Sequence, residues 1–539
     1  MAANLIFKNG RIYTVDPNRP WAEAVAVEGK KIACVGDNEE VLAFADDDTC
    51  IIDLQGRMML PGLIDAHCHA ISAAYFNTGL IMDFQDLTEP TLKKIRDYIE
   101  ARPDDTFYFG RGYRENNLLE MESPKAVLDE ICSDKPIFFA GAGLHSAWCN
   151  SKALEITGIT KDTPDPDPGI QFFDRLPNGE PNGNLIESDA MLSVMDKLDL
   201  FDDDRVKEEM KKVSDSYNEL GVTSVQDGGA WGDMAYTGRR ILREMAEQQE
   251  YNLRVETCEF ITSKSLVEGV VDRLKEGKEK YDDDYLRVGF LKVLDDGIYE
   301  SETCGMVEPY LDGTNCETLL PTEDLIQVTL DAAKAGFDTA VHNIGDKTAR
   351  DVLLSAKAVR ESGDNDTRII SIHSITINDD DYQMFKDYQV IANSSAQWCL
   401  KSPFKESIIG DRAQRTFMLK TLMHLSPALT FGSDHPADEF GKSPFIGIEM
   451  GITRQLFDNP EMPILLPLSE RLTVADMIRG YTINAAYQMR MENKIGSIEE
   501  GKYADMIVID QNLFEIDPHD IHNTNVDITV YDGRIVYER

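Results

Sequence analysis

Long apolar runs are missing from this chain, since none approaches the roughly 18 residues that a membrane-spanning helix requires. The first residues also lack the basic start, apolar core and small-residue cleavage site of a secretory signal. Positive charge is scarce too, with 54 Lys and Arg against 96 Asp and Glu and a net charge of −42. Because such a surface repels phosphate backbones and anionic lipids, we expect neither nucleic acids nor membranes as partners.

Closely spaced cysteine pairs are absent as well. The nine cysteines are odd in number, scattered along the chain and include no Cys-x-x-Cys. This pattern favours free thiols in a reducing compartment over a disulfide framework. We therefore predict a cytoplasmic location.

Histidine is also rare, at 9 of 539 residues, yet two histidines stand together in His67-Cys68-His69. They end an apolar run, 59–66, that contains a Pro61-Gly62 turn. Residues i and i+2 of a strand point to the same side, so both imidazoles can reach one metal ion. The competing interpretation is an accidental pair in a surface loop. The apolar run and the scarcity of histidine favour the metal site.

Both ends of the chain are typical of short strands joined by tight turns. Asn9-Gly10 and Asp532-Gly533 each separate two apolar or β-branched runs, which is the signal of a hairpin. We predict that 1–58 and 491–539 combine into one small β-sandwich domain.

Between the two ends, apolar β-rich runs alternate with helical stretches, the pattern of a parallel sheet covered by helices. Including the run that ends at His67, there are eight candidate strands, the number that closes an α/β barrel of the (β/α)8 TIM type over 59–490. The other seven are 222–227, 253–260, 288–294, 339–344, 368–373, 390–394 and 428–434.

Residues 71–205 do not fit this alternation and form a long insertion after the first strand. Since loops that follow barrel strands lie on the catalytic face, we expect the insertion to cover the active site. A helix over 206–220 then resumes the barrel.

Polar residues near the ends of these strands should converge around the barrel axis. Taken alone, each has a structural explanation: a hydrogen-bonded buried histidine, a lysine whose charged end reaches solvent, or an aspartate that caps a helix. Their joint placement on the correct strands favours a metal centre. The set is His67, His69, Lys292, His342, His373 and Asp434.

Lys292 sets the type of centre that we expect. An ammonium group cannot bind a metal, but a neutral amine can take up carbon dioxide and become a carbamate. N6-carboxylysine at this position would act as a carboxylate that bridges two cations. The sequence thus leaves open one or two divalent metal ions.

The segments 61–69, 341–346, 372–373 and 431–436 resemble the metal-dependent amidohydrolase superfamily, in particular its amidohydrolase-3 branch. The resemblance extends over nearly the whole chain. It implies hydrolysis of a carbon–nitrogen bond in an amide, with zinc as the usual metal. It also implies that His67, His69 and Asp434 hold one ion, that His342 and His373 hold a second, and that carboxylated Lys292 bridges them.

The resemblance gives Asp434 the role of proton shuttle between the attacking water and the departing nitrogen, and we predict Asp434 and His373 as the catalytic residues. Three segments depart from the family pattern, namely Asp296-Gly297-Ile298, Gln397-Trp398 and Gly112-Tyr113-Arg114. Since these positions face the expected pocket, we predict an unusual substrate. The substrate-binding candidates are His145, Arg111, Tyr113, Arg114, Trp148, Asp296, Gln397, Trp398 and Arg454.

Two other functions remain open at this point. One is a deaminase or cyclic amide hydrolase that uses a single metal on the same barrel. The other, from a different class, is a non-catalytic regulatory or binding homologue, although the intact set of ligands argues against it. The sequence leaves open which small amide is cut and whether the protein forms a homodimer.

Overall fold

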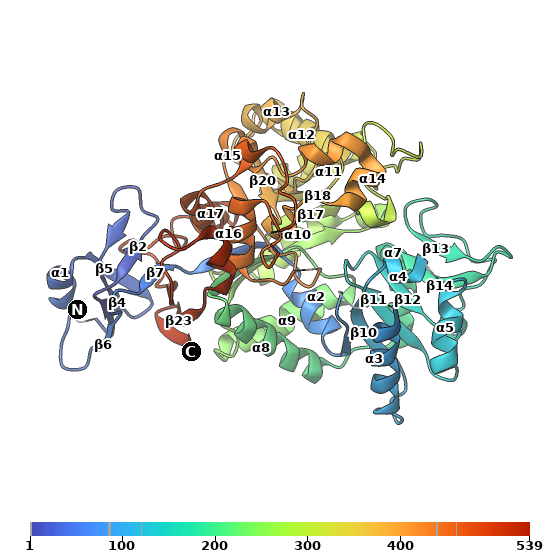
Figure 1. The fold of residues 1–539 in the computed structure, drawn as a ribbon, viewed down its shortest axis with the longest axis horizontal. Coiled ribbons are helices and arrows are strands. Elements are labelled where there is room, and N and C mark those ends of the chain that lie inside the picture. Colours follow the sequence, from blue (N-terminus) through green and yellow to red (C-terminus); the bar gives the residue numbers. More distant parts are fainter. Residues whose placement is uncertain (1–2, 85–87, 120, 438–439, 460) are drawn as a thin grey trace.

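The computed structural model describes residues 3–84, 88–119, 121–437, 440–459 and 461–539. Its centre is an eight-stranded sheet in the order β21-β20-β19-β18-β17-β16-β15-β8, in which every neighbouring pair is parallel (Figure 1). This sheet confirms the predicted barrel. Its strands, in chain order, are β8 (Leu63–Cys68), β15 (Val222–Asp227), β16 (Arg254–Ile261), β17 (Leu286–Leu294), β18 (Asp338–Asn343), β19 (Ile369–His373), β20 (Val390–Ser394) and β21 (Leu429–Phe431).

The first and last strands meet through two backbone hydrogen bonds beyond the end of β21. The amide of Asp434 donates to the His67 carbonyl at 2.8 Å, and the amide of His69 donates to the His435 carbonyl at 2.6 Å. We call this pair of bonds the barrel seam. It brings the loop after β21 against the end of β8.

The run before His67 is two strands rather than one. β7 (Met58–Pro61) pairs with β2 (Arg11–Tyr13) and β22 (Met506–Ile509), outside the barrel, and only β8 enters the barrel sheet. The break falls at Gly62, where a Cβ atom would lie 2.3 Å from Thr223 Oγ1. The prediction of a single strand was therefore wrong here. At the break, the close approach of β15 leaves room only for glycine.

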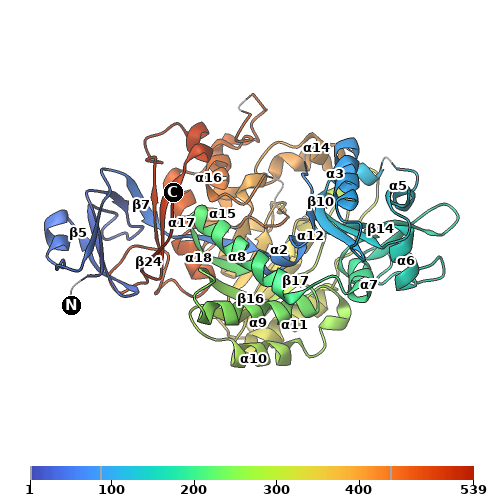
Figure 2. The same cartoon turned by 90° about the horizontal axis from the view of Figure 1, so that it is seen from below.

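Helices cover the outside of the barrel (Figures 1 and 2). The helix before β15, α8 (Asp203–Glu219), begins where the Asp202 side chain accepts a hydrogen bond from the Arg205 amide. Its apolar residues Val206, Met210, Val213 and Tyr217 follow a three-to-four-residue spacing, so they share one face, which is buried. The others are α9 (Asp233–Glu247), α10 (Val270–Lys280), α11 (Thr322–Lys334), α12 (Asp346–Glu361), α13 (Tyr382–Asp387), α15 (Leu419–Leu425), α16 (Pro444–Thr453), α17 (Val474–Gly480) and α18 (Ile483–Gln488).

The segment between β8 and β15 begins with α2 (Ala70–Phe76) and then builds its own sheet, in the order β13-β14-β12-β11-β10-β9. This sheet encloses a separate apolar core that includes Tyr108, Phe139 and Trp148. The strands are β9 (Leu80–Ile81), β10 (Tyr108–Tyr113), β11 (Ile137–Gly141), β12 (Ser146–Cys149), β13 (Phe172–Arg175) and β14 (Pro181–Ile186), with helices α3 (Thr88–Glu100), α4 (Asn116–Leu119), α5 (Pro124–Ile131), α6 (Ser151–Thr157) and α7 (Ser188–Leu198).

The two ends of the chain form a β-rich unit of two sheets, drawn in blue and red at one side of the barrel in Figure 1. A common core joins residues from both ends, including Phe7, Val27, Met506 and Val530. One sheet has the order β5-β4-β1-β6 and the other β24-β23-β22-β7-β2-β3. The strands not yet given are β1 (Leu5–Lys8), β3 (Trp21–Ala22), β4 (Ala24–Glu28), β5 (Lys31–Gly36), β6 (Cys50–Asp53), β23 (Val526–Tyr531) and β24 (Arg534–Glu538).

Among the described residues, no helix has both the length and the apolar character to cross a membrane.

Candidate metal centre and substrate cavity

The first half of the candidate metal centre forms at the barrel seam. Oδ1 of Asp434 lies 3.2 Å from Nε2 of His67 and 3.5 Å from Nε2 of His69. The other nitrogen of His69, Nδ1, lies 2.7 Å from the Gly229 carbonyl, which directs Nε2 toward the centre. One carboxylate oxygen between two imidazole nitrogens is an arrangement that suits a shared metal ion.

The second half comes from β18 and β19. The ring centroids of His342 and His373 are 4.7 Å apart, and those of His67 and His373 are 5.2 Å apart. Asp296 orients His342, since its Oδ1 lies 2.9 Å from Nδ1 of the ring. Asp296 is itself fixed by hydrogen bonds from the Gly345 amide and the Thr348 hydroxyl, both at 2.9 Å. Asp296, a predicted substrate-binding candidate, thus orients His342, as carboxylates beside metal-binding histidines do.

The donor set fits a divalent metal ion. Ligand atoms of His67, His373 and Asp434 all lie within 4.8 Å of one another, and all three residues are buried. Nδ1 of His373 is buried and has no hydrogen-bond partner among the described residues, which is costly unless another ligand satisfies it. His373 and Asp434 also have φ angles of 69° and 61°, a backbone strain that is typical of functional sites.

The protonation states of these residues suit metal binding as well. Burial lowers the pKa of His67 to about 3 and the pKa of His373 well below its usual range, so both rings are neutral and keep a lone pair. Burial raises the pKa of Asp434, but its interactions with His373, His67 and His69 outweigh burial and hold the pKa well below its ordinary value. The carboxylate is therefore charged.

Lys292 joins this group from β17. Its Nζ lies 3.3 Å from Nε2 of His67, and only 1% of the residue is exposed. Burial lowers the pKa of Lys292 to about 8. All six predicted ligands therefore lie in one cluster at the carboxyl ends of the barrel strands.

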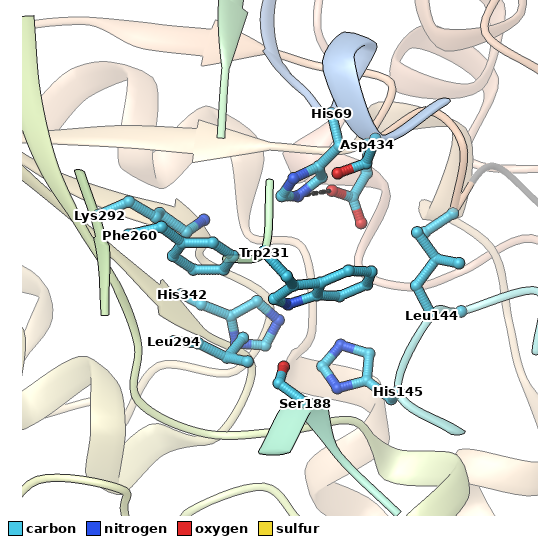
Figure 3. Close-up of a pocket in the computed structure, with 13 residues that line it drawn as sticks. His69, Leu144, His145, Ser188, Trp231, Phe260, Lys292, Leu294, His342 and Asp434 are labelled. Atoms are coloured by element: carbon cyan, nitrogen blue, oxygen red, sulfur yellow. Dashed lines mark ion pairs between the residues drawn. The ribbon is translucent and has the colours of Figure 1, made fainter. Parts of the chain in front are cut away.

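Two cavities open onto the cluster. The smaller one, about 40 Å³, is shown in Figure 3, and its lining includes His69, Lys292, His342 and Asp434 from the barrel together with His145 from the insertion. The larger one, about 290 Å³, shares His145, His342 and Asp434 with the smaller one and is also lined by His373. It extends over an apolar wall formed by Ile298, Tyr299, Ile344, Ile375, Trp398, Leu400 and Phe404.

Three of the predicted substrate-binding residues line these cavities. His145 lines both of them, whereas Arg114 and Trp398 line the larger one. The Trp398 ring stacks on His373 with centroids 5.3 Å apart. Gln397 lies one step away, where its amide donates to the Ser433 carbonyl at 2.7 Å and so supports the backbone that carries Asp434.

The structure does not bring the remaining candidates to either cavity. Tyr113 and Trp148 pack edge-on in the insertion core, and the Trp148 indole donates to the Pro124 carbonyl. Arg111 donates to the carbonyl of Pro436 at 3.2 Å. Arg454 is fully buried, and its guanidinium donates to the carbonyls of Leu465 and Phe417 at 2.9 and 2.7 Å. Arg454, a predicted substrate-binding candidate, therefore has a structural role in which its guanidinium binds loop carbonyls.

Other residues of the site were not predicted from the sequence. Trp231 and Phe260 line the smaller cavity from the ends of β15 and β16. Trp231 is one of only four tryptophans and follows a predicted strand end, a signal that could have identified it. Glu187 in the insertion, whose Oε2 lies 2.8 Å from Nδ1 of His145, left no comparable signal.

The sequence model of the amidohydrolase family matches residues 50–537. The chain belongs to the amidohydrolase family. The match confirms the resemblance drawn from the motifs around His67, His342, His373 and Asp434. As an amidohydrolase, the protein is a metal-dependent hydrolase that acts on carbon–nitrogen bonds.

Relatives of this amidohydrolase differ in their recorded roles. N-substituted formamide deformylase of Arthrobacter pascens is 27% identical over 560 residues, 99% of this chain and 98% of that protein. Exoenzymes regulatory protein AepA of Pectobacterium carotovorum subsp. carotovorum is 29% identical over 381 residues, 69% of this chain and 80% of that protein. An uncharacterized metal-dependent hydrolase from Pyrococcus furiosus has the same fold, with a TM-score of 0.73 at 23% identity over 95% of this chain and 100% of that one.

Near the centre of this amidohydrolase, Asp295 is a buried carboxyl whose Oδ2 has no hydrogen-bond partner among the described residues. Burial raises the pKa of Asp295 to about 8. The folded state therefore retains a proton that the unfolded state loses near pH 4, so this group lowers the free energy of unfolding progressively as the pH rises toward 8. We expect Asp295→Asn to raise that free energy by about 1–3 kcal/mol at pH 8.5 and by less at pH 5.5. Urea unfolding at both values measures the effect, and an equal gain at both would contradict it.

Proposed function

We propose that the protein hydrolyses the carbon–nitrogen bond of a small amide, such as an N-formyl or N-acyl amine with an apolar arm. The observation that carries this proposal is the buried carboxylate of Asp434 between His67 and His69, directly beside a cavity of about 290 Å³. The cavity is large enough for a small organic molecule, and its wall is mainly apolar.

His67, His69 and Asp434 would hold one divalent ion, and His342 and His373 a second. Imidazole and carboxylate donors suit zinc. Carboxylated Lys292 would bridge the two ions: a bond forms between Nζ and the carbon of carbon dioxide, and Nζ loses a proton. When bound, the metal supplies a water of lowered pKa and polarises the carbonyl group.

The other steps belong to side chains of this chain. Asp434 accepts the proton of the attacking water and delivers it to the departing nitrogen, so that an amine and a carboxylic acid leave. The apolar arm would pack against Trp398 and Phe404, which excludes water from one side of the reacting group. Gln397 and Asp296 keep Asp434 and His342 in place.

A panel of amides tests this function. Metal-free protein, prepared with a chelator, is loaded with zinc and assayed against N-formyl amines, N-acyl amines and cyclic amides. We expect turnover of at least one acyclic amide with a benzyl or alkyl arm, together with loss of activity on metal removal. Turnover of cyclic amides or amino-substituted rings alone would favour the alternative deaminase or cyclic amide hydrolase.

The regulatory alternative has a specific observation in its favour, since one relative is named a regulatory protein. Against it stands the complete ligand set. If the metal-loaded protein hydrolyses no member of the panel, the proposed catalytic function is overturned and the non-catalytic function takes its place.

We also propose that the substrate is a free small molecule, that nucleic acids and membranes are not partners, and that the protein works in the cytoplasm. The nine cysteines are all unpaired in the structure, which supports a reducing compartment. The high negative charge supports the choice of partner.

A further inference from the structure

We propose that Glu187 is a positioning residue that holds His145 as a hydrogen-bond donor to the carbonyl oxygen of the amide. This inference rests on the proposed function, because it assigns a role in amide hydrolysis to two residues of the insertion. It gives the insertion a part in the chemistry in addition to covering the cavity.

The two residues face each other at the end of a strand pair. β12 and β14 are antiparallel with Ser146 opposite Ile186, so His145 and Glu187 are the next pair along. The Glu187 amide donates to the His145 carbonyl at 2.8 Å. The side chains pair as well, with 2.8 Å between Nδ1 of His145 and Oε2 of Glu187. Because Nδ1 is bound in this way, Nε2 is the nitrogen left to contact a ligand in the cavities.

The carboxylate of Glu187 is also fixed from the barrel side. The hydroxyl of Thr303 donates to Oε1 at 3.3 Å. A Cβ atom at position 297 would lie 2.6 Å from Oε1, so Gly297 makes the room that the carboxylate occupies. Gly297 follows Asp296, which orients His342. One loop after β17 therefore places two carboxylates, and each of them orients a histidine of the site.

The backbone at Glu187 is strained, with φ of 65° and ψ of 171°. This region is used almost only by glycine, so a glutamate there needs a compensating role. Glu187 is the residue that precedes α7, yet its side chain makes no capping hydrogen bond. Neither backbone freedom nor helix capping explains a glutamate here, whereas the bond to His145 does.

His145 faces the candidate metal centre across the cavity in which the amide would bind. It lines both cavities, its ring centroid is 5.6 Å from that of His342, and Figure 3 shows it on the opposite side of the cavity from Asp434. The carboxylate of Glu187, 2.8 Å from Nδ1 of His145, favours the protonated form of the ring. With Nδ1–H donated to Glu187, only the protonated imidazole carries a second hydrogen, on Nε2, that it can donate to a ligand.

The step itself is balanced without proton transfer to or from His145. The water oxygen forms a bond to the carbonyl carbon while the π electrons of the carbonyl move onto its oxygen, and His145 donates a hydrogen bond to that developing anion. The anion then reforms the carbonyl, the carbon–nitrogen bond breaks, and Asp434 supplies the proton to nitrogen. Removal of one such donor costs about 10²–10³-fold in kcat.

A double-mutant cycle tests the inference with the acyclic amide that the metal-loaded wild type hydrolyses best. We expect His145→Gln to lower kcat by about 10²–10³-fold and to change KM by less than about threefold. Glu187→Gln should lower kcat by about tenfold or more. Because Glu187 acts through His145, the double variant should be no slower than His145→Gln alone. A tetrahedral phosphonamidate analogue of the substrate should lose affinity in proportion to kcat/KM.

The chain provides a matched control in Glu449, whose Oε2 lies 2.8 Å from Nδ1 of His522 outside both cavities. Glu449→Gln should lower the thermal midpoint and keep kcat. Additive losses in the double variant, or a rise in KM without loss of kcat, would overturn the positioning role. If Glu187→Gln folds poorly, the kcat and KM of His145→Gln still test the inference. Wild-type protein that cuts no amide would overturn the proposed function together with this inference. Active wild-type protein whose kcat is unchanged by His145→Gln and Glu187→Gln would overturn only the inference.

Discussion

Asp434→Asn is expected to lower kcat by about 10⁴-fold while the protein remains folded. Asparagine has the shape of aspartate and can still occupy the space beside His67 and His69. It cannot accept the proton of the attacking water or return it to the nitrogen. Because the carboxylate is charged in the folded state, the loss should persist across the neutral pH range. Steady-state rates on the best amide substrate measure the effect.

Two controls accompany this substitution. The metal content separates loss of the proton shuttle from loss of the ion, and the midpoint of thermal unfolding verifies the fold. A variant with normal metal content and a kcat within about tenfold of wild type would show that another group moves the proton.

Lys292→Ala is expected to remove at least one of two metal ions per chain and to lower kcat by at least about 10³-fold. In the proposed centre the carboxylated lysine is the only group shared by both ions, so its loss separates them. The 3.3 Å distance between Nζ and the His67 ring places the amine inside the ligand cluster. Short carboxylic acids such as acetate should restore part of the activity, because they can occupy the space of the missing carbamate.

Lys502→Ala is the matched control, since Lys502 is also buried, with Nζ 2.6 Å from both the Glu492 carbonyl and the Ser497 hydroxyl. It should lose stability and keep its metal. Elemental analysis of both variants and of wild type measures the outcome. One ion in wild type, retained in Lys292→Ala, would contradict the bridged centre and favour the mononuclear alternative.

The barrel could be predicted from sequence because its strands are covered on both faces and therefore appear as continuous apolar runs. The metal cluster could be predicted because its members stand at the ends of those runs. The split at Gly62 could not, since both halves of the run are equally apolar and only the pairing partners differ.

The substrate side of the site was harder to predict for a physical reason. An arginine that clamps a substrate and one that holds loop carbonyls have the same local sequence, so the role of Arg454 depends on tertiary contacts. The same holds for Tyr113 and Trp148, which fill the core of the insertion. Glu187 is recognisable by its strained backbone and its partner across the sheet, and neither is visible in the order of residues.

The barrel seam places a constraint on how the protein matures. The Asp434 amide donates to the His67 carbonyl, so two residues that close the barrel are also proposed metal ligands, one from its first segment and one from its last. These segments are far apart in the chain, so their contact closes a long loop. The complete ligand set therefore exists only in a closed barrel. Capture of an ion by the full proposed ligand set would therefore require that the first and last segments have met, which would tie metal loading to closure of the barrel.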